Sequence, residues 1–133
     1  MQILERFERR GLRIVALKLV SVTESEARRH YAEHAGKFFF DGLVSYLQSG
    51  PIVATVLEGP DAIPIVRSMV GSTRPHEAAP GTIRGDFAVA GLRNLIHASD
   101  APETAAREIG QWFHSDEILE YERNLDDSIY EAD

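Results

Sequence analysis

The sequence contains no cysteine, so disulfide bonds, thiolate metal sites and thiol catalysis are excluded together. Lysine is also scarce: only Lys18 and Lys37 occur, and arginine supplies the rest of the 14 basic residues. No apolar run approaches the roughly 20 residues that a membrane-spanning helix needs. The first residues also lack the long apolar stretch of a signal peptide. We therefore expect a cytoplasmic protein with no membrane partner.

Positive charge is in the minority. Lysine and arginine total 14 against 21 acidic residues, which gives a formal net charge of −7. This balance argues against a general binder of nucleic-acid backbones, because such proteins neutralise phosphates with basic side chains. Apolar residues make up 44% of the chain, which is enough to build a core. A length of 133 residues fits a single domain spanning residues 1–133.

The hydrophobic pattern alternates between helices and single strands. Helices are predicted at residues 3–10, 23–34, 41–48, from 59 onward, and 100–113. Strands are predicted at 12–20, at 52–57, where the strand reads as buried, and at 95–97. Residues 71–91 read as a long loop punctuated by proline and glycine. This order favours an α/β or α+β sandwich, with helices packed on one sheet.

One histidine stands where a nucleophile would be useful. His97 follows the apolar run Leu95-Ile96 and precedes the small and polar residues Ala98 and Ser99. A neutral imidazole at the end of a strand is a good nucleophile near pH 7, provided that a partner fixes its tautomer. The alternative is a structural histidine that is hydrogen-bonded at the strand terminus.

A carboxylate follows on the next predicted helix. Glu108 lies on or beside the apolar stripe formed by Ala105, Ile109 and Trp112. A carboxylate on such a stripe needs a partner, and His97 is close along the chain. The alternative is a solvated position at the edge of the stripe.

Two arginines and a threonine flank or lie within the long loop. Arg67 is at the margin of an apolar helix face, Arg84 lies between Gly81 and Gly85, and Thr73 adds a hydroxyl. Guanidinium groups suit phosphate oxygens because of their forked geometry. Each arginine alone is more often a surface salt-bridge partner. Together with a nucleophilic histidine, they suggest phosphoryl transfer.

The segment around the histidine also resembles a known signature. Residues 93–100 are similar to the N-x-x-H-G-S-D motif of nucleoside diphosphate kinases. The resemblance runs from Met1 to about Glu131. Its further motifs are His30-Tyr31, residues 39–44, Ser49-Gly50-Pro51, residues 80–86, Gln111-Trp112-Phe113 and Ile129-Tyr130-Glu131.

The resemblance implies a ferredoxin-like α/β sandwich with an antiparallel sheet. It further implies a ping-pong kinase that moves a γ-phosphate between nucleoside triphosphates and diphosphates through a phosphohistidine. Mg²⁺ is expected to be held by the nucleotide phosphates, largely through water, so no protein metal site is expected. A homo-oligomer is implied, and the ending Ile129-Tyr130-Glu131 favours a hexamer.

Residue roles follow from the same motif positions. His97 resembles the phosphorylated nucleophile and Glu108 the carboxylate that orients its ring, with Tyr31 and Ser99 supporting them. The nucleotide-binding set implied by the resemblance is Phe39 and Leu43 at the base, Asn94 at the sugar, and Arg67, Thr73 and Arg84 at the phosphates.

Three departures from the family pattern stand out. Ala98 replaces a glycine, which matters if that position needs a positive φ angle. Gly91-Leu92 stands where the family has an apolar residue followed by glycine, so the apolar wall opposite Phe39 is in question. The family's first strand, with its phosphate-binding lysine, has no counterpart after Met1. We therefore expect the sequence to be a fragment of a longer product that is poorly active without this strand.

Two other functions stay open at this point. One is a catalytically weak family member that serves as a nucleotide-binding or assembly module. The other is a binder of single-stranded nucleic acid, against which the charge of −7 argues.

Overall fold

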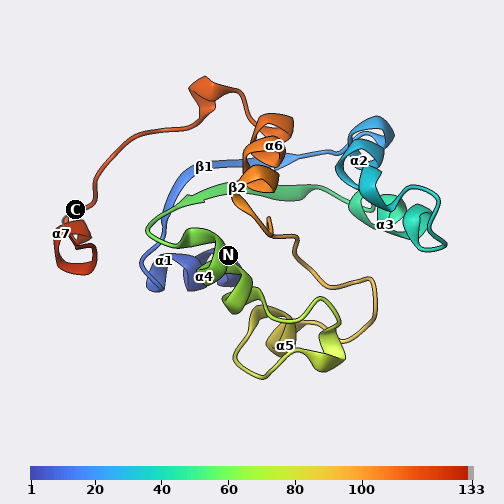
Figure 1. Ribbon diagram of the computed structural model, residues 1–133, viewed down its shortest axis with the longest axis horizontal. Helices are drawn as coiled ribbons and strands as arrows, with labels where there is room; N and C mark the ends of the chain where they lie inside the picture. The colour runs from blue at the N-terminus through green and yellow to red at the C-terminus, as the bar shows by residue number, and fades with distance from the viewer. Residues whose placement is uncertain (132–133) are drawn as a thin grey trace. The chain divides into compact units, whose positions relative to one another are not determined.

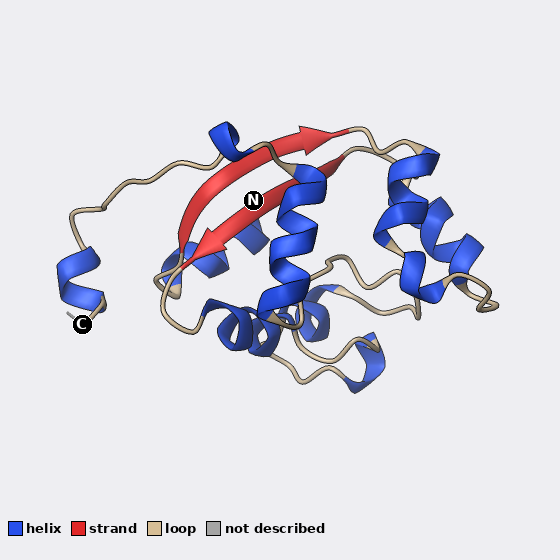
Figure 2. Cartoon of the chain, turned by 45° about the horizontal axis from the view of Figure 1, so that its top comes forward, coloured by secondary structure: helices blue, strands red, loops and turns tan. Residues whose placement is uncertain are grey.

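A two-stranded antiparallel sheet forms the β part of the chain. In the computed structural model, which describes residues 1–131, β1 (Arg13–Val20) pairs with β2 (Ile52–Glu58). Figure 2 shows the strands side by side and pointing in opposite directions. Across the pair, the Thr55 hydroxyl donates to the carbonyl oxygen of Ala16 at 2.9 Å. The α+β class and the antiparallel pairing expected from the sequence are confirmed.

Helices make up most of the remaining regular structure (Figure 1). The α-helices are α1 (Gln2–Arg9), α2 (Glu24–His30), α3 (Phe40–Leu47), α4 (Ala62–Val70), α5 (Ile83–Phe87), α6 (Pro102–Trp112) and α7 (Asp126–Ile129). The 3₁₀ turns are η1 (Ala32–His34), η2 (Pro75–Glu77) and η3 (Ser115–Glu117). Within residues 1–131, no helix combines the length and apolar character that crossing a bilayer would require.

The chain divides into two compact units, to both of which β1 and β2 contribute residues. Unit 1 comprises residues 1–17, 55–68 and 98 onward. Its buried apolar side chains lie on α1, on both strands, and directly before β1 or after α6, and they include Phe7, Leu12, Val15, Ala16, Val56 and Phe113. Gly11 ends α1 with a φ of +104°, a conformation that glycine adopts without strain.

Unit 2 comprises residues 18–54 and 69–97. Its buried apolar residues include Val22, Ala27, Val44, Val70 and Ile83. A capping box begins α2, since Thr23 and Glu26 exchange side-chain to backbone hydrogen bonds. The hydrogen bonds from Thr23 also lower the pKa of Glu26. Helices α2 and α3 lie against each other (Figure 1).

Four predicted features need correction. The strand at 52–57 exists but is not buried throughout, because its side chains alternate: Val53 is 51% exposed and Val56 9%. Residues 95–97 form no strand, because Leu95 has a φ of +73°, which turns the chain out of the extended conformation. The loop 71–91 contains η2 and α5. The helix predicted over 23–34 also breaks after His30 into the separate turn η1.

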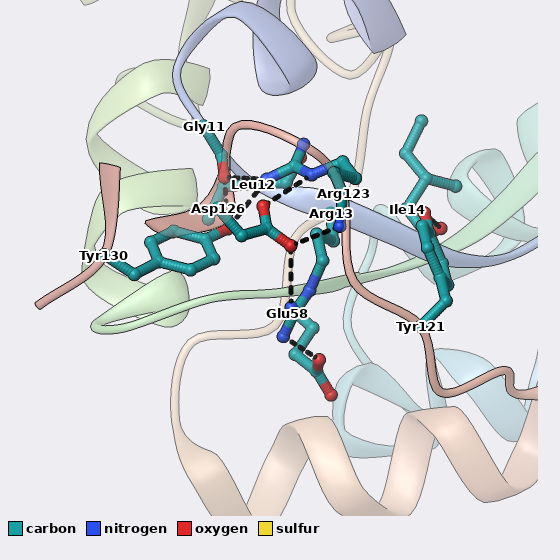
Figure 3. Close-up of polar contacts among 9 residues, drawn as sticks. All are labelled: Gly11, Leu12, Arg13, Ile14, Glu58, Tyr121, Arg123, Asp126 and Tyr130. Carbon is teal, nitrogen blue, oxygen red and sulfur yellow. Dashed lines mark hydrogen bonds and ion pairs between the residues drawn. The ribbon is translucent and has the colours of Figure 1, made fainter. Parts of the chain in front are cut away.

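The C-terminal segment of unit 1 runs along β1 (Figure 3). The amide of Leu119 donates to the carbonyl oxygen of Val15 at 2.9 Å, and the Tyr121 hydroxyl donates to that of Ile14. Arg123 donates to the carbonyl oxygens of Leu12 and Gly11, at 3.1 and 2.7 Å. These bonds occupy backbone acceptors along β1 and the turn before it.

One carboxylate ties this segment to the strand. Asp126 Oδ2 accepts from Arg13 at 3.1 Å and from the Arg123 amide at 2.7 Å, while Oδ1 accepts from Arg123 Nε at 2.9 Å. Arg13 also contacts Glu58 of β2 at 2.5 Å. Burial opposes the charge of Asp126, but the hydrogen bonds from Arg123 and Arg13 outweigh it and lower its pKa.

We expect Asp126→Asn to lower the melting temperature at neutral pH and to do so less in acid. The folded-state pKa of Asp126 lies below its unfolded value of about 3.9. Its contribution to stability is therefore complete above that unfolded value and is lost as the pH falls through the folded pKa. Thermal unfolding of the wild-type protein and of Asp126→Asn between pH 7 and pH 2.5 measures the difference in melting temperature, which should become smaller as the pH falls.

Asp127→Asn is the matched control, because Asp127 is the exposed neighbour in α7. It should leave the melting temperature nearly unchanged. An equal effect of the two substitutions at pH 7 would contradict the role given to Asp126.

Candidate functional site

The tight helix α5 in unit 2 positions the first candidate residue, Arg84. Thr82 caps the helix, its hydroxyl accepting from the Gly85 amide at 3.0 Å. A Cβ atom at position 85 would lie 2.0 Å from the carbonyl oxygen of Ala79, so this close approach requires glycine. Arg84, which the sequence pattern placed in a long loop, thus lies on a short helix.

Arg84 is buried, with 3% of its surface exposed. Its guanidinium donates to three carbonyl oxygens: Asn94 at 3.2 Å, Gly71 at 3.3 Å, and Ile96. The alternative considered from the sequence, that Arg84 is a surface salt-bridge partner, is therefore wrong. The forked geometry of guanidinium lets one side chain satisfy acceptors on two separate segments.

These bonds hold the segment that leads to the histidine. Residues 94–97 have no strand pairing, so their carbonyl groups need other donors. Arg84 supplies them at Asn94 and Ile96, and the side-chain amide of Asn94 donates to the carbonyl oxygen of Thr73 at 3.2 Å. These bonds bring Asn94, Thr73 and Arg84 together in unit 2.

His97, the last residue of this segment in unit 2, is exposed. It does not stand at a strand end, since the predicted strand is missing. Its ring lies edge to face with the buried His30, with ring centroids 4.5 Å apart and planes at 83°. His30 contacts Tyr31 in the same manner at 4.7 Å. In the sequence, His30 stands out only as part of a family motif, and no spacing indicates this contact.

Phe39 and Leu43 lie at the start of α3 and just inside it, and both are half-buried. The ring of Phe39 contacts His34, with centroids 5.4 Å apart, and the Lys37 ammonium lies 5.6 Å from its centroid. The neighbouring Phe38 is 98% exposed. A Cβ atom at Gly42 would lie 3.4 Å from the side chain of Leu92. Leu92, which lies between α5 and α6, therefore reaches α3.

Three further candidates belong to unit 1. Arg67 of α4 donates to the carbonyl oxygen of Ala98 at 3.1 Å. Glu108 of α6 is 6% exposed and accepts from the Ser99 hydroxyl at 2.8 Å. The alternative of a solvated edge position for Glu108 is therefore wrong. Ala98 is not among the described residues with a positive φ, so the missing glycine imposes no strain there.

The candidates thus fall into two groups, one in each unit. Unit 2 carries Tyr31, Phe39, Leu43, Thr73, Arg84, Asn94 and His97, and unit 1 carries Arg67, Ser99 and Glu108. Chemically, they offer an accessible imidazole, two guanidinium groups, hydroxyls, a buried carboxylate and an aromatic face.

Comparison with known proteins decides the family. The sequence model described as nucleoside diphosphate kinase matches residues 1–118. A nucleoside diphosphate kinase of Roseiflexus sp. is 57% identical over 129 residues, covering 97% of this chain and 87% of the relative. One from Archaeoglobus fulgidus is 52% identical, covering 98% and 86%.

This chain belongs to the nucleoside diphosphate kinase family. A solved structure of a halophilic nucleoside diphosphate kinase from Halobacterium salinarum in complex with CDP superimposes with a TM-score of 0.95 at 45% identity, covering 98% of this chain and 87% of that one. A family protein from Babesia bovis gives 0.92 at 43% identity. The expected family and its phosphotransferase class are thus confirmed.

We expect Arg84→Ala to destabilise this kinase-family chain strongly. Each buried carbonyl group left without a donor costs about 1–3 kcal/mol, so the free energy of unfolding should fall by at least ~2 kcal/mol. Arg84→Lys should recover a small part of the loss, because an ammonium cannot span the same acceptors. Urea unfolding monitored by circular dichroism measures these differences.

Arg74→Ala serves as the control, since Arg74 is an exposed arginine of the same unit and contacts Glu77 at 3.7 Å. Its loss should change the free energy of unfolding by less than about 0.5 kcal/mol. Equal losses in the free energy of unfolding for Arg84→Ala and Arg74→Ala would contradict the structural role given to Arg84.

Proposed function

We propose that this chain moves the γ-phosphate of a nucleoside triphosphate to a nucleoside diphosphate through a phosphohistidine at His97. The observation that carries the proposal is the exposed imidazole of His97, at the end of a segment whose carbonyl groups Arg84 binds. A neutral imidazole nitrogen would attack the γ-phosphorus as the bond to the β-phosphate oxygen breaks, and the diphosphate leaves. A second diphosphate then attacks the same phosphorus, and the nitrogen–phosphorus bond breaks.

The remaining residues would position the substrates and balance their charge. Phosphoryl transfer depends mainly on placement and electrostatic stabilisation. Arg67, Arg84 and Thr73 are proposed to face the phosphates, Asn94 the sugar, and Phe39 with Leu43 the base. Stacking against an aromatic face, without hydrogen bonds to the base edges, would accept any base. Glu108, with Ser99 and Tyr31, is proposed to orient the His97 ring.

Mg²⁺ fits this proposal without a protein metal site. The proposed phosphate-facing set consists of donors, and the carboxylate of Glu108 already accepts from Ser99. The ion would therefore be held by the phosphates and water, where it neutralises phosphate charge. A homo-oligomer, with a hexamer favoured, stays a prediction, as do the single domain and the cytoplasmic location.

The test is to incubate the chain with γ-labelled ATP and Mg²⁺. His97 should acquire an acid-labile, base-stable phosphate, and His97→Ala should acquire none. Label that persists in His97→Ala would contradict the assignment. A chain that binds nucleotides but takes no label would instead support the alternative, a catalytically weak binding or assembly module.

We expect Arg67→Ala to slow the transfer step by an amount on the order of 2–4 kcal/mol in activation free energy, because it removes charge stabilisation at the phosphates. Single-turnover labelling measures the rate, and a melting curve of the same variant measures stability. A stability loss with an unchanged rate would show that Arg67 acts only on the Ala98 carbonyl group.

Glu108→Ala should slow labelling without abolishing it, because an orienting partner assists the nucleophile and does not replace it. Glu103→Ala, at an exposed position in the first turn of the same helix, is the matched control and should label at the normal rate. An unchanged rate in Glu108→Ala would remove its orienting role.

A further inference from the structure

His30 is a buried histidine for which the proposed reaction has no use so far. It is the last residue of α2, and its burial leaves 9% of its surface exposed. The capping box at Thr23 and Glu26 fixes the start of this helix, and α3 packs against it. The imidazole of His30 is therefore held on a stable element of unit 2.

The ring of His97 is the opposite case. It is exposed and follows a segment without strand pairing, so no regular element of the described chain carries it. The ring of His30 lies 4.5 Å from it, at an interplanar angle of 83°. Edge-to-face packing of this kind favours one relative orientation of two rings. The same His30 ring contacts Tyr31 at 4.7 Å and 70°, so it packs with two of the proposed site residues.

We propose that His30 is a positioning residue for His97: its buried ring sets the orientation in which the His97 imidazole meets the γ-phosphate. The inference rests on the proposed function, since it assumes that His97 is the nucleophile. His30 acts through ring packing and makes no contact with the transferred group. A nucleophile held in the right orientation gains rate, because small misplacements at a reacting atom are costly.

Three variants test this role: His30→Ala removes the ring, His30→Phe restores an aromatic ring, and Val22→Ala is the control. Val22 is a buried residue of the same unit, beside the opposite end of α2, and its truncation weakens the core without removing a ring. Single-turnover labelling with γ-labelled ATP gives the phosphorylation rate of His97. Titration with ATP in the absence of Mg²⁺ gives the binding affinity, and melting curves give the stability.

We expect His30→Ala to slow phosphorylation about tenfold to a hundredfold, with ATP affinity changed by less than about threefold. His30→Phe should recover most of the rate. Val22→Ala should lose thermal stability while it keeps both rate and affinity. The proton signals of the His97 ring should shift in His30→Ala, because the ring current of the neighbouring imidazole is lost. In His30→Phe these signals should still show a ring-current shift, because an aromatic ring is present.

Three results would overturn the proposal: a normal rate in His30→Ala, a rate in His30→Phe as low as in His30→Ala, or an equal slowing in Val22→Ala. If the wild-type protein takes up no phosphate label, that result would instead count against the proposed function. The His97 ring signals then still decide the contact, because they do not depend on phosphorylation.

Discussion

The hydrogen bonds of the buried Arg84 guanidinium are the constraint on which the candidate site depends. The segment from Asn94 to His97 belongs to neither strand of the sheet, and yet its backbone is polar and partly buried. Arg84 binds the carbonyl groups of Asn94 and Ile96 on this segment and that of Gly71 across the loop. One side chain thus takes the place of a strand ladder, and it fixes the path of the backbone up to the histidine.

That role changes how Arg84 should be considered in the reaction. A guanidinium group committed to backbone carbonyls keeps its full positive charge, and it keeps a fixed position. Electrostatic stabilisation of a phosphoryl group benefits from a charge that need not reorganise during the reaction. The structural and the proposed catalytic uses of Arg84 therefore support each other.

Sequence patterns predicted those parts of the fold that are set by local chemistry. The helices predicted over 3–10, 41–48 and 100–113 lie close to the observed bounds of α1, α3 and α6, and the helix predicted from residue 23 begins there but ends earlier than expected. The motif around His97 also gave the family. The strand expected at 95–97 is absent because Leu95 has a positive φ, which the apolar pattern of the sequence does not indicate.

Long-range side-chain contacts were the other part that the sequence could not supply. Three pairs of residues contact each other only in the folded chain, and no periodicity in the sequence links their members. These pairs are Arg84 with Ile96, His30 with His97, and Arg13 with Asp126. Burial of Glu108 was predictable only as one of two readings, because a position beside an apolar stripe fits either a core carboxylate or a solvated one. The packing of α6 against the rest of unit 1 decides between them.

The excess of arginine over lysine has a physical explanation in these contacts. Arg84 spans three carbonyl groups, Arg123 spans two carbonyl groups and the Asp126 carboxylate, and Arg13 joins Asp126 to Glu58. Each of these tasks needs several donors in a fixed plane, which an ammonium group does not offer. A chain with only two strands in its described residues has few ladder bonds with which to hold irregular segments. Planar guanidinium groups, each with several donors, hold these segments in both units. In unit 2, the same hydrogen bonds place His97.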